Sequence, residues 1–292
     1  MKKRPLIPYL LILPSMVLLT VFLVYPLLDT TRLSFFDYSY LSPEAKKFVG
    51  FKNYIELFTG DDNFRSSLGF TLRFTFACIT LEFILGLTIA LVLKQVVRLG
   101  SLIRTISIFP YMIAAIAAGQ MWRLLFNYDY GVVNYVLSML SIKPVNWLGS
   151  FSSAFWACVI TEIWRSVPFV MLILLSGLQS IPGDIMEAAK VDGANARQGF
   201  VRITFPLLLP SITIALIFET IFKLRVFDII ITLTGGGPGK STTPLGVLIQ
   251  RNYFQSFEAG YSGAISVVLL VLGGVISLLY LKFIGTENRA AS

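Results

Sequence analysis

Long apolar runs separated by shorter polar stretches dominate the chain. A transmembrane helix needs about 20 mostly apolar residues, and six parts of the sequence meet that length. They cover residues 6–28, 70–93, 105–126, 153–178, 206–233 and 261–284. The pattern predicts an all-α, polytopic membrane protein with six transmembrane helices. Because no internal repeat or low-complexity linker interrupts it, we expect a single transmembrane domain over residues 1–292.

Proline residues mark several of these apolar runs. Pro14 and Pro26 lie in the first run, and Pro168, Pro206 and Pro210 lie in later ones. Proline removes a helical hydrogen bond, so we expect kinked helices, which often border a cavity. The first run also resembles a signal peptide, but it continues without a small-x-small cleavage site, so we expect it to remain as a membrane anchor.

Composition agrees with a membrane protein and excludes several other classes. The mean hydropathy is +0.76, and only 14% of the residues are charged, far from the average of soluble domains. The net charge of +8 comes from scattered basic residues without a stripe, so we expect no nucleic-acid partner. The absence of His removes His-based metal sites and the commonest general base. We therefore expect no catalytic residue and no metal site.

Basic residues predict the orientation in the membrane. Residues 2–4 are all basic, and Lys94, Arg98 and Arg104 lie in a loop without acidic residues, so the positive-inside rule places both segments in the cytoplasm. An even number of spans then puts both termini there. The loop at residues 179–205 falls on the same side.

This cytoplasmic loop carries the most informative segment of the chain, EAAKVDGANARQGFVRITFPLLLP at residues 187–210. Asp184 is placed to cap a short helix, with Glu187 three residues later in a capping-box position. Gly193 is available to end that helix. A polar helix between two apolar spans is typical of a docking element for a soluble partner.

The segment resembles the coupling loop of carbohydrate ABC importer permeases, the inner-membrane components of binding-protein-dependent transport systems for maltose, trehalose or glycerol phosphate. Ile203, Pro206 and Pro210 continue the family pattern. The resemblance implies the type I ABC importer permease fold, with the loop at 179–205 seated in a cleft of an ATPase subunit. It assigns ATPase coupling to five residues: Glu187, Ala188, Ala189, Asp192 and Gly193.

A glycine-rich run, LTGGGPGKST at residues 233–242, ends like a phosphate-binding loop. The Walker pattern needs Gly where the chain has Thr234, and it should follow a strand on the cytoplasmic side. The run instead ends a span on the predicted outer side. It resembles the T-G-G-G-P segment after the fifth span of sugar permeases, with a flexible outer loop as the alternative. We expect no nucleotide to bind there.

Charged residues within the predicted spans form the third signal, because an ionisable group at membrane depth costs several kcal/mol unless it faces a polar interior. One interpretation is internal ion pairing, since Glu219 and Lys223 are spaced i,i+4. The other is a polar cavity. Counting from Glu187 and Thr234, the resemblance places the sugar pathway at nine positions: Glu162, Arg165, Ser166, Phe169, Phe218, Glu219, Phe222, Lys223 and Val226.

These side chains suit a sugar, because charged groups bond paired hydroxyls and aromatic rings cover the C–H face. Family members often have Asn or Ser where this chain has Glu162, Glu219 and Lys223, so the sugar itself stays open.

The resemblance further implies a transport subunit that is not an enzyme. Its expected partners are a second homologous permease, two ATPase subunits that hold ATP and Mg, an extracytoplasmic sugar-binding protein and the lipid bilayer. The complex would import a di- or oligosaccharide or related polyol by alternating access across a bacterial or archaeal cytoplasmic membrane. The alternative is an ion-coupled secondary transporter in which Glu82, Glu162 and Glu219 carry protons.

Overall fold

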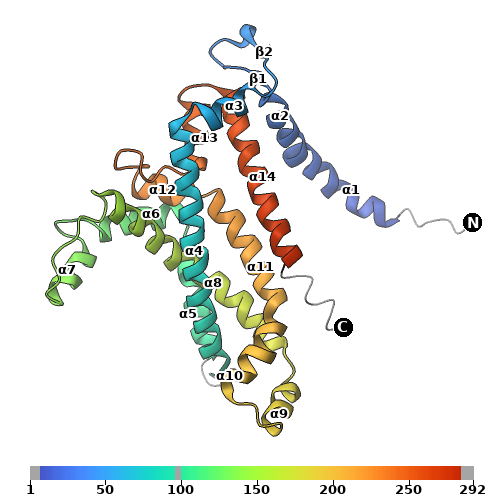
Figure 1. Cartoon of the computed structure of the whole chain (residues 1–292), viewed down its shortest axis with the longest axis vertical. Coiled ribbons are helices and arrows are strands. Elements are labelled where there is room, and N and C mark those ends of the chain that lie inside the picture. Colours follow the sequence, from blue (N-terminus) through green and yellow to red (C-terminus); the bar gives the residue numbers. More distant parts are fainter. Residues whose placement is uncertain (1–6, 96–99, 284–292) are drawn as a thin grey trace, which may run out of the picture. The chain divides into compact units, whose positions relative to one another are not determined.

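The computed structural model describes residues 7–95 and 100–283 and is mostly helical (Figure 1). It forms two compact units, which are described separately. The first unit comprises Met1–Arg65 and Leu248–Val271, and the second comprises Ser66–Val247 and Leu272–Ser292. The expected single membrane domain over residues 1–292 stays a prediction.

The first unit contains the N-terminal helices and a small hairpin. The side-chain amide of Asn53 donates to the carbonyl oxygens of Ser34 and Phe36 and so fixes the start of the hairpin. The two strands are antiparallel, with Phe36 opposite Phe48. The elements that begin in this unit are α1 (Ile7–Leu19), a π-helical turn (Thr20–Val24), α2 (Tyr25–Leu33), β1 (Phe36–Asp37), a 3-10 turn (Pro43–Ala45), β2 (Lys47–Phe48), α3 (Lys52–Thr59), α4 (Asp62–Gln95) and α14 (Ala259–Phe283).

The second unit contains the remaining helices, with α8 packed against α5, α6, α11 and α12. Of the most apolar part of α8, 61% of the residues are buried, a larger share than in any other described span, so α8 forms the centre of this unit. The elements that begin here are α5 (Gly100–Met112), α6 (Ala115–Leu125), α7 (Val132–Met139), α8 (Phe151–Ser180), α9 (Gly183–Val191), α10 (Ala196–Gly199), a π-helical turn (Phe200–Thr204), α11 (Phe205–Leu224), α12 (Asp228–Leu233) and α13 (Leu245–Phe254).

Proline shapes two of the helices through π-helical turns. The turns Thr20–Val24 and Phe200–Thr204 each end two residues before a proline, Pro26 and Pro206. Because proline cannot donate its backbone N–H to the preceding turn, the helix widens there to relieve the clash. The helices are therefore irregular next to Pro26 and Pro206, whereas the assigned helices continue through Pro14, Pro168 and Pro210. The expected kinks at these prolines stay a prediction.

Five described helices are long and apolar enough to span a membrane. They are Tyr9–Leu33, Asp62–Gln95, Phe151–Ser180, Ala196–Leu224 and Ala259–Lys282. The predicted span at 105–126 is instead a bent pair, α5 and α6, with 89° between the two helices. The backbone leaves the helical region at Ala114 (ψ 135°), which causes the break.

The predicted span at 206–233 is also interrupted. Helix α11 ends at Leu224, and α12 begins only at Asp228. Phe227 between them has φ −142° and ψ −60°, outside the helical region. Only Gly fits at 246, since a Cβ there would lie 2.8 Å from the carbonyl oxygen of Val226, and this close approach holds the interruption in place.

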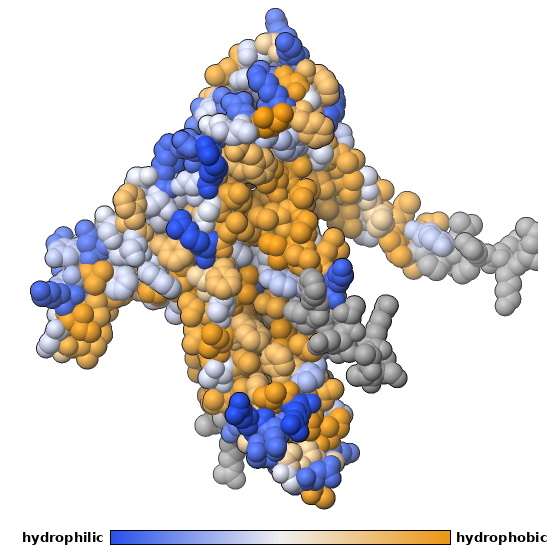
Figure 2. All heavy atoms as spheres, in the orientation of Figure 1, coloured by the Kyte–Doolittle hydropathy of each residue, from blue (hydrophilic) through white to orange (hydrophobic). Residues whose placement is uncertain are grey.

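The orientation in the membrane stays a prediction. The basic residues 2–4 and Arg98 lie outside the described residues, whereas Lys94 and Arg104 lie within them. Figure 2 shows polar residues gathered at the end of the second unit that carries α9 and α10, next to apolar surface along the long helices. This distribution agrees with a docking loop at a membrane boundary.

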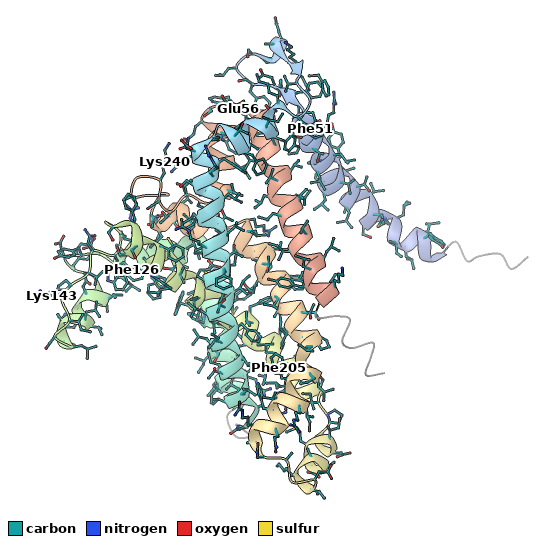
Figure 3. The ribbon with its side chains drawn as sticks, viewed as in Figure 1. Phe51, Glu56, Phe126, Lys143, Phe205 and Lys240 are labelled. Carbon is teal, nitrogen blue, oxygen red and sulfur yellow. The ribbon has the colours of Figure 1, made fainter. Side chains whose placement is uncertain are left out.

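Two apolar clusters form the core of the second unit. The first includes Phe70 and Phe74 of α4 and Ile230 of α12. It also includes Phe126, which lies beside the end of α6 (Figure 3). The second joins α4, α8 and α11 through Ala90, Val170, Met171, Leu174, Leu208 and Ile212. Along α4 and α8, Glu82 and Glu162 lie between members of the two clusters, and on α11, Glu219 and Lys223 follow the members of the second cluster.

Candidate functional site

A buried charged cluster separates the two apolar clusters. It comprises Glu82 of α4, Glu162 of α8, and Glu219 and Lys223 of α11, none of which is more than 3% exposed. Lys223 and Glu219 face the same way because they are one helical turn apart. Both interpretations of the intramembrane charges thus apply, since ion pairing is present and one member of the cluster also reaches a cavity.

The ammonium group of Lys223 lies at the centre of this cluster. Its Nζ is 2.6 Å from Glu162 Oε1, 2.8 Å from Glu219 Oε2 and 3.0 Å from Glu82 Oε1. It also donates a 2.9 Å hydrogen bond to Ser166 Oγ. One cation therefore links three helices, which is the arrangement that makes a buried ion tolerable in an apolar environment.

A cavity of about 220 Å³ opens beside this cluster. Glu162, Arg165 and Ser166 of α8 form one side of it, and Glu162 Oε1 accepts hydrogen bonds from Arg165 Nη2 (3.2 Å) and Ser166 Oγ (3.0 Å). The full lining comprises Tyr111, Ala115, Glu162, Arg165, Ser166, Phe222, Arg225, Val226, Phe227, Asp228 and Ile229.

Five of the nine sequence-predicted sugar residues line this cavity: Glu162, Arg165, Ser166, Phe222 and Val226. Glu219 and Lys223 instead lie behind the lining, 2% and 0% exposed. Phe169 and Phe218 lie in an adjoining aromatic group. The structure therefore brings the nine predicted residues into one region, where five line the cavity, two lie behind its wall and two lie beside it.

That aromatic group borders the polar wall. The ring of Phe169 stacks on Tyr111 at 5.2 Å between centroids, and it contacts Phe218 and Phe222 edge-on at 6.2 and 6.1 Å. The guanidinium of Arg165 lies 5.7 Å from the centre of the Tyr111 ring, within the range of a cation–π contact. Polar groups and an apolar ring face thus meet at one cavity.

Sequence reasoning missed part of this lining. Arg225 and Asp228 lie within the predicted span at 206–233 but were not placed in the cavity, and Tyr111 was not singled out. All three border helix interruptions, Tyr111 before the bend at Ala114 and the two charges on either side of Phe227. Their charge at membrane depth was the one signal that pointed to Arg225 and Asp228.

The predicted coupling loop forms a short helix, α9, as expected. Glu187, Ala188, Asp192 and Gly193 are exposed, whereas Ala189 is 8% exposed. The methyl group of Ala189 therefore faces the chain itself, so of the two alanines predicted to couple to the ATPase only Ala188 is exposed. Exposed apolar side chains that the sequence analysis did not name, Ile185 and Val191, lie on the same helix.

The predicted cap of this helix is wrong. Pro182 occupies the N-cap position without a side-chain bond, so Asp184 lies inside the first turn and Glu187 completes no capping box. The capping box belongs to α10, where Asn195 and Gln198 exchange two hydrogen bonds of 2.9 Å. Gly193 ends α9 as predicted, since its φ of +80° favours glycine.

The loop after α12 is held by threonine side chains. Thr242 Oγ1 donates to the Gly237 carbonyl at 2.6 Å and lies 2.7 Å from Thr234 Oγ1, while Thr243 Oγ1 donates to the Gly236 carbonyl at 3.0 Å. These bonds fold the loop back on itself. It follows a helix, not a strand, unlike a phosphate-binding loop.

Comparison with known proteins identifies the family. Residues 82–284 match the profile of the binding-protein-dependent transport system inner membrane component. This match covers more than half of the chain. The chain belongs to this permease family. Its all-α fold with long membrane helices is the type I permease fold predicted from the sequence.

Relatives match the permease along most of their length. A trehalose/maltose transport system permease protein, MalF, of Thermococcus litoralis is 42% identical over 94% of this chain and 92% of its own. A sulfoquinovosyl glycerol transport system permease protein, SmoG, of Agrobacterium fabrum is 38% identical over 97% and 92%. The prediction of a sugar-permease relative is confirmed.

A solved structure confirms the fold of the permease. A chain of a bacterial alginate ABC transporter, in complex with an alginate pentasaccharide-bound periplasmic protein, superimposes with a TM-score of 0.80 at 24% identity. The match covers 94% of this chain and 92% of that chain. The family match supports the importer interpretation and gives no support to the ion-coupled secondary transporter.

Proposed function

We propose that this permease is a membrane-spanning subunit of an ATP-driven importer for a neutral sugar, a di- or oligosaccharide or a related polyol. The observation that carries the proposal is the cavity in which Glu162, Arg165 and Ser166 lie beside the ring of Phe222. Carboxylate, guanidinium and hydroxyl groups bond sugar hydroxyls, and an aromatic ring covers the C–H face.

The charges of the cavity favour a neutral substrate. Its lining holds two cations, Arg165 and Arg225, and two anions, Glu162 and Asp228. Arg165 pairs with Glu162 at 3.2 Å, so a full negative charge on the substrate would meet an opposing carboxylate. The cavity is smaller than the roughly 300–1,000 Å³ of common ligand sites, because a second permease subunit would supply the facing wall.

The coupling loop supports transmission of force from ATPase subunits. Helix α9 follows α8, which carries the cavity wall, and it precedes α11, which carries Lys223. Thr204, at the entry to α11, lies 3.6 Å from the sulfur of Met186 in α9. A displacement of α9 would therefore move the two helices that form the cavity and produce alternating access.

The partners follow from this arrangement. Glu187 would offer a carboxylate to a basic group of an ATPase subunit, and ATP and Mg would bind to those subunits alone. A second related permease and an extracytoplasmic sugar-binding protein complete the importer. It lies in a bacterial or archaeal cytoplasmic membrane, with both termini and α9 in the cytoplasm.

Copurification tests this proposal. The chain is extracted from its native membrane in a mild detergent, and the proteins that accompany it are identified by mass spectrometry. We expect an ATPase and a second permease with the wild type, and at least severalfold less ATPase with Glu187→Ala, because the variant lacks the exposed carboxylate of α9.

Glu44→Ala is the matched control, since it removes an exposed carboxylate far along the chain from the coupling loop. It should leave the ATPase and the second permease at wild-type amounts. Recovery of the wild-type chain without an ATPase would contradict the proposed function. Equal loss of the ATPase in both variants would contradict the role of Glu187.

A further inference from the structure

Lys223 is completely buried, yet it touches two residues that line the cavity. Its Nζ donates hydrogen bonds to Glu162 Oε1 at 2.6 Å and to Ser166 Oγ at 2.9 Å. Both acceptors line the cavity, whereas Lys223 does not belong to the lining. The lysine therefore holds the polar wall from behind.

Two further carboxylates hold Lys223 itself. Glu82 Oε1 and Glu219 Oε2 lie 3.0 and 2.8 Å from its Nζ, and neither residue lines the cavity. A buried ammonium without partners costs several kcal/mol, so these carboxylates keep it in a single place. Since Lys223 and its three carboxylate partners come from α4, α8 and α11, the wall is fixed to three helices.

The hydrogen bonds also orient the carboxylate of Glu162. Lys223, Arg165 and Ser166 all donate to its Oε1. Three donors on one oxygen fix the plane of the carboxylate and direct the other oxygen, Oε2, away from them. An acceptor of fixed position binds a sugar hydroxyl without the loss of side-chain freedom that a mobile one incurs.

We propose that Lys223 is a positioning residue of the sugar cavity: it fixes Glu162 and Ser166 for the substrate while Glu82 and Glu219 hold the lysine in place. This inference rests on the proposed function. It replaces direct contact between Lys223 and the sugar, which its burial disfavours. It also gives the three carboxylates a shared role as partners of one cation.

The experiment compares two variants that differ at Lys223 alone. Glu82→Gln/Glu219→Gln removes the two supporting charges and keeps Lys223 on Glu162. The triple variant adds Lys223→Met, which leaves Glu162 with Arg165 and Ser166. The single variant Lys223→Met is avoided, because it would leave three carboxylates without their buried cation and would disturb the fold.

Initial uptake of [14C]maltose and [14C]trehalose is measured in native cells that carry each variant, together with copurification of the ATPase. We expect the triple variant to assemble and to show a KM about tenfold higher with little change in Vmax. The loss of one hydrogen bond to a charged group weakens binding by about this factor. The double variant should show a smaller rise in KM, because Lys223 still donates to Glu162 and Ser166 but has lost the two carboxylates that hold it.

A second readout needs no sugar. Val226 lines the cavity and is 8% exposed, so Val226→Cys is labelled with a hydrophilic thiol reagent after the buried Cys78 and Cys158 are replaced by Ala. We expect severalfold faster labelling in the triple variant than in the double variant, because the wall loses its support.

Several outcomes would overturn the inference. Equal KM values and equal labelling rates in the two variants would show that Lys223 does not position the wall. Failure of only the triple variant to assemble would assign Lys223 to the stability of the fold. Absence of both sugars from wild-type cells would count against the proposed substrate, and the labelling comparison would still decide the role of Lys223.

Discussion

Single charged side chains determine how tightly the cavity binds a substrate. Asp228 is exposed and lines the cavity at the start of α12. In Asp228→Asn the carboxylate becomes an amide of the same size, so hydrogen bonds to sugar hydroxyls become weaker. We expect the KM of sugar uptake to rise about tenfold, measured as initial uptake rate against concentration.

Asp129→Asn provides the control for this prediction. Asp129 is exposed but lies outside the cavity lining, so its substitution should leave the KM unchanged. If Asp228→Asn had the wild-type KM, Asp228 would not be a sugar-binding residue.

A second residue-scale prediction concerns acidic side chains of the first unit. Burial, followed by the neighbouring carboxylates of Glu56, Asp37 and Asp61, raises the pKa of Glu258 above its ordinary value of 4.5. Protonated Glu258 is therefore favoured in the folded state. Its contribution to stability is complete below the ordinary pKa and is lost as the pH rises through the raised pKa.

Glu258→Gln stays neutral at every pH and should avoid this loss. We expect its melting temperature to exceed that of the wild type by about 1–2 °C at pH 7, with no difference at pH 3.5. Glu44→Gln serves as the control, because Glu44 does not contribute to the raised pKa. The same gain at both pH values would show that charge repulsion is not the cause.

At the scale of elements, the turn after α9 sets the geometry of the coupling loop. Gly193 has φ +80° and no atom within 4 Å of a Cβ placed there, so Gly193→Ala introduces backbone strain without a clash. The strain amounts to about 1–2 kcal/mol. We expect less ATPase to copurify with this variant than with the wild type.

Gly183→Ala is the control, because it replaces a glycine of the same helix without introducing backbone strain. Gly183 also has open space where a Cβ would lie, but it belongs to the first turn of α9 and has no positive φ. It should retain the wild-type amount of ATPase. Equal losses in the two variants would argue against a role for the left-handed turn.

The packing of α6 on α12 depends on another glycine. A Cβ at Gly119 would overlap the Oγ1 of Thr232. We expect Gly119→Ala to lower stability by about 1–3 kcal/mol, measured by thermal unfolding in detergent, and Thr232→Ala to recover part of it. Gly274→Ala, where a Cβ meets nothing within 4 Å, should cost nothing; an equal loss there would contradict the clash.

Elements differ in how well the sequence predicts them. Helices α4, α8, α11 and α14 follow from apolar length alone, because a span must be long and continuous. The interruptions at Ala114 and Phe227 do not, since backbone angles there depend on tertiary packing such as the approach of Gly246 to Val226. The apolar pattern continues through Ala114, and at Phe227 the flanking charges of Arg225 and Asp228 do not by themselves indicate a break in the helix.

The contacts within the site can also be predicted from the sequence only in part. The i,i+4 spacing predicted the pairing of Glu219 with Lys223, and the structure has it at 2.8 Å. The contacts of Lys223 with Glu82 and Glu162 join distant parts of the sequence, so they depend on how the helices rotate and pack. The same dependence separates the cavity lining from the groups behind it.

At the scale of the whole molecule, the second unit joins the proposed coupling loop to the cavity. Helices α8 and α11 pack against each other, carry the polar wall and its support, and are linked by α9 and α10. Movement of the loop is therefore expected to change the cavity. We infer that ATP-driven movement of this kind, and not an ion gradient, drives sugar transport.

The most direct test measures sugar uptake in native cells under two treatments. One depletes ATP while the membrane potential is maintained, and the other applies a protonophore while fermentation maintains ATP. A strain that lacks the permease gives the background. We expect permease-dependent uptake of [14C]maltose or [14C]trehalose to stop without ATP and to continue with the protonophore. Uptake that collapses with the protonophore while ATP remains would rule out ATP-driven transport and favour an ion-coupled carrier.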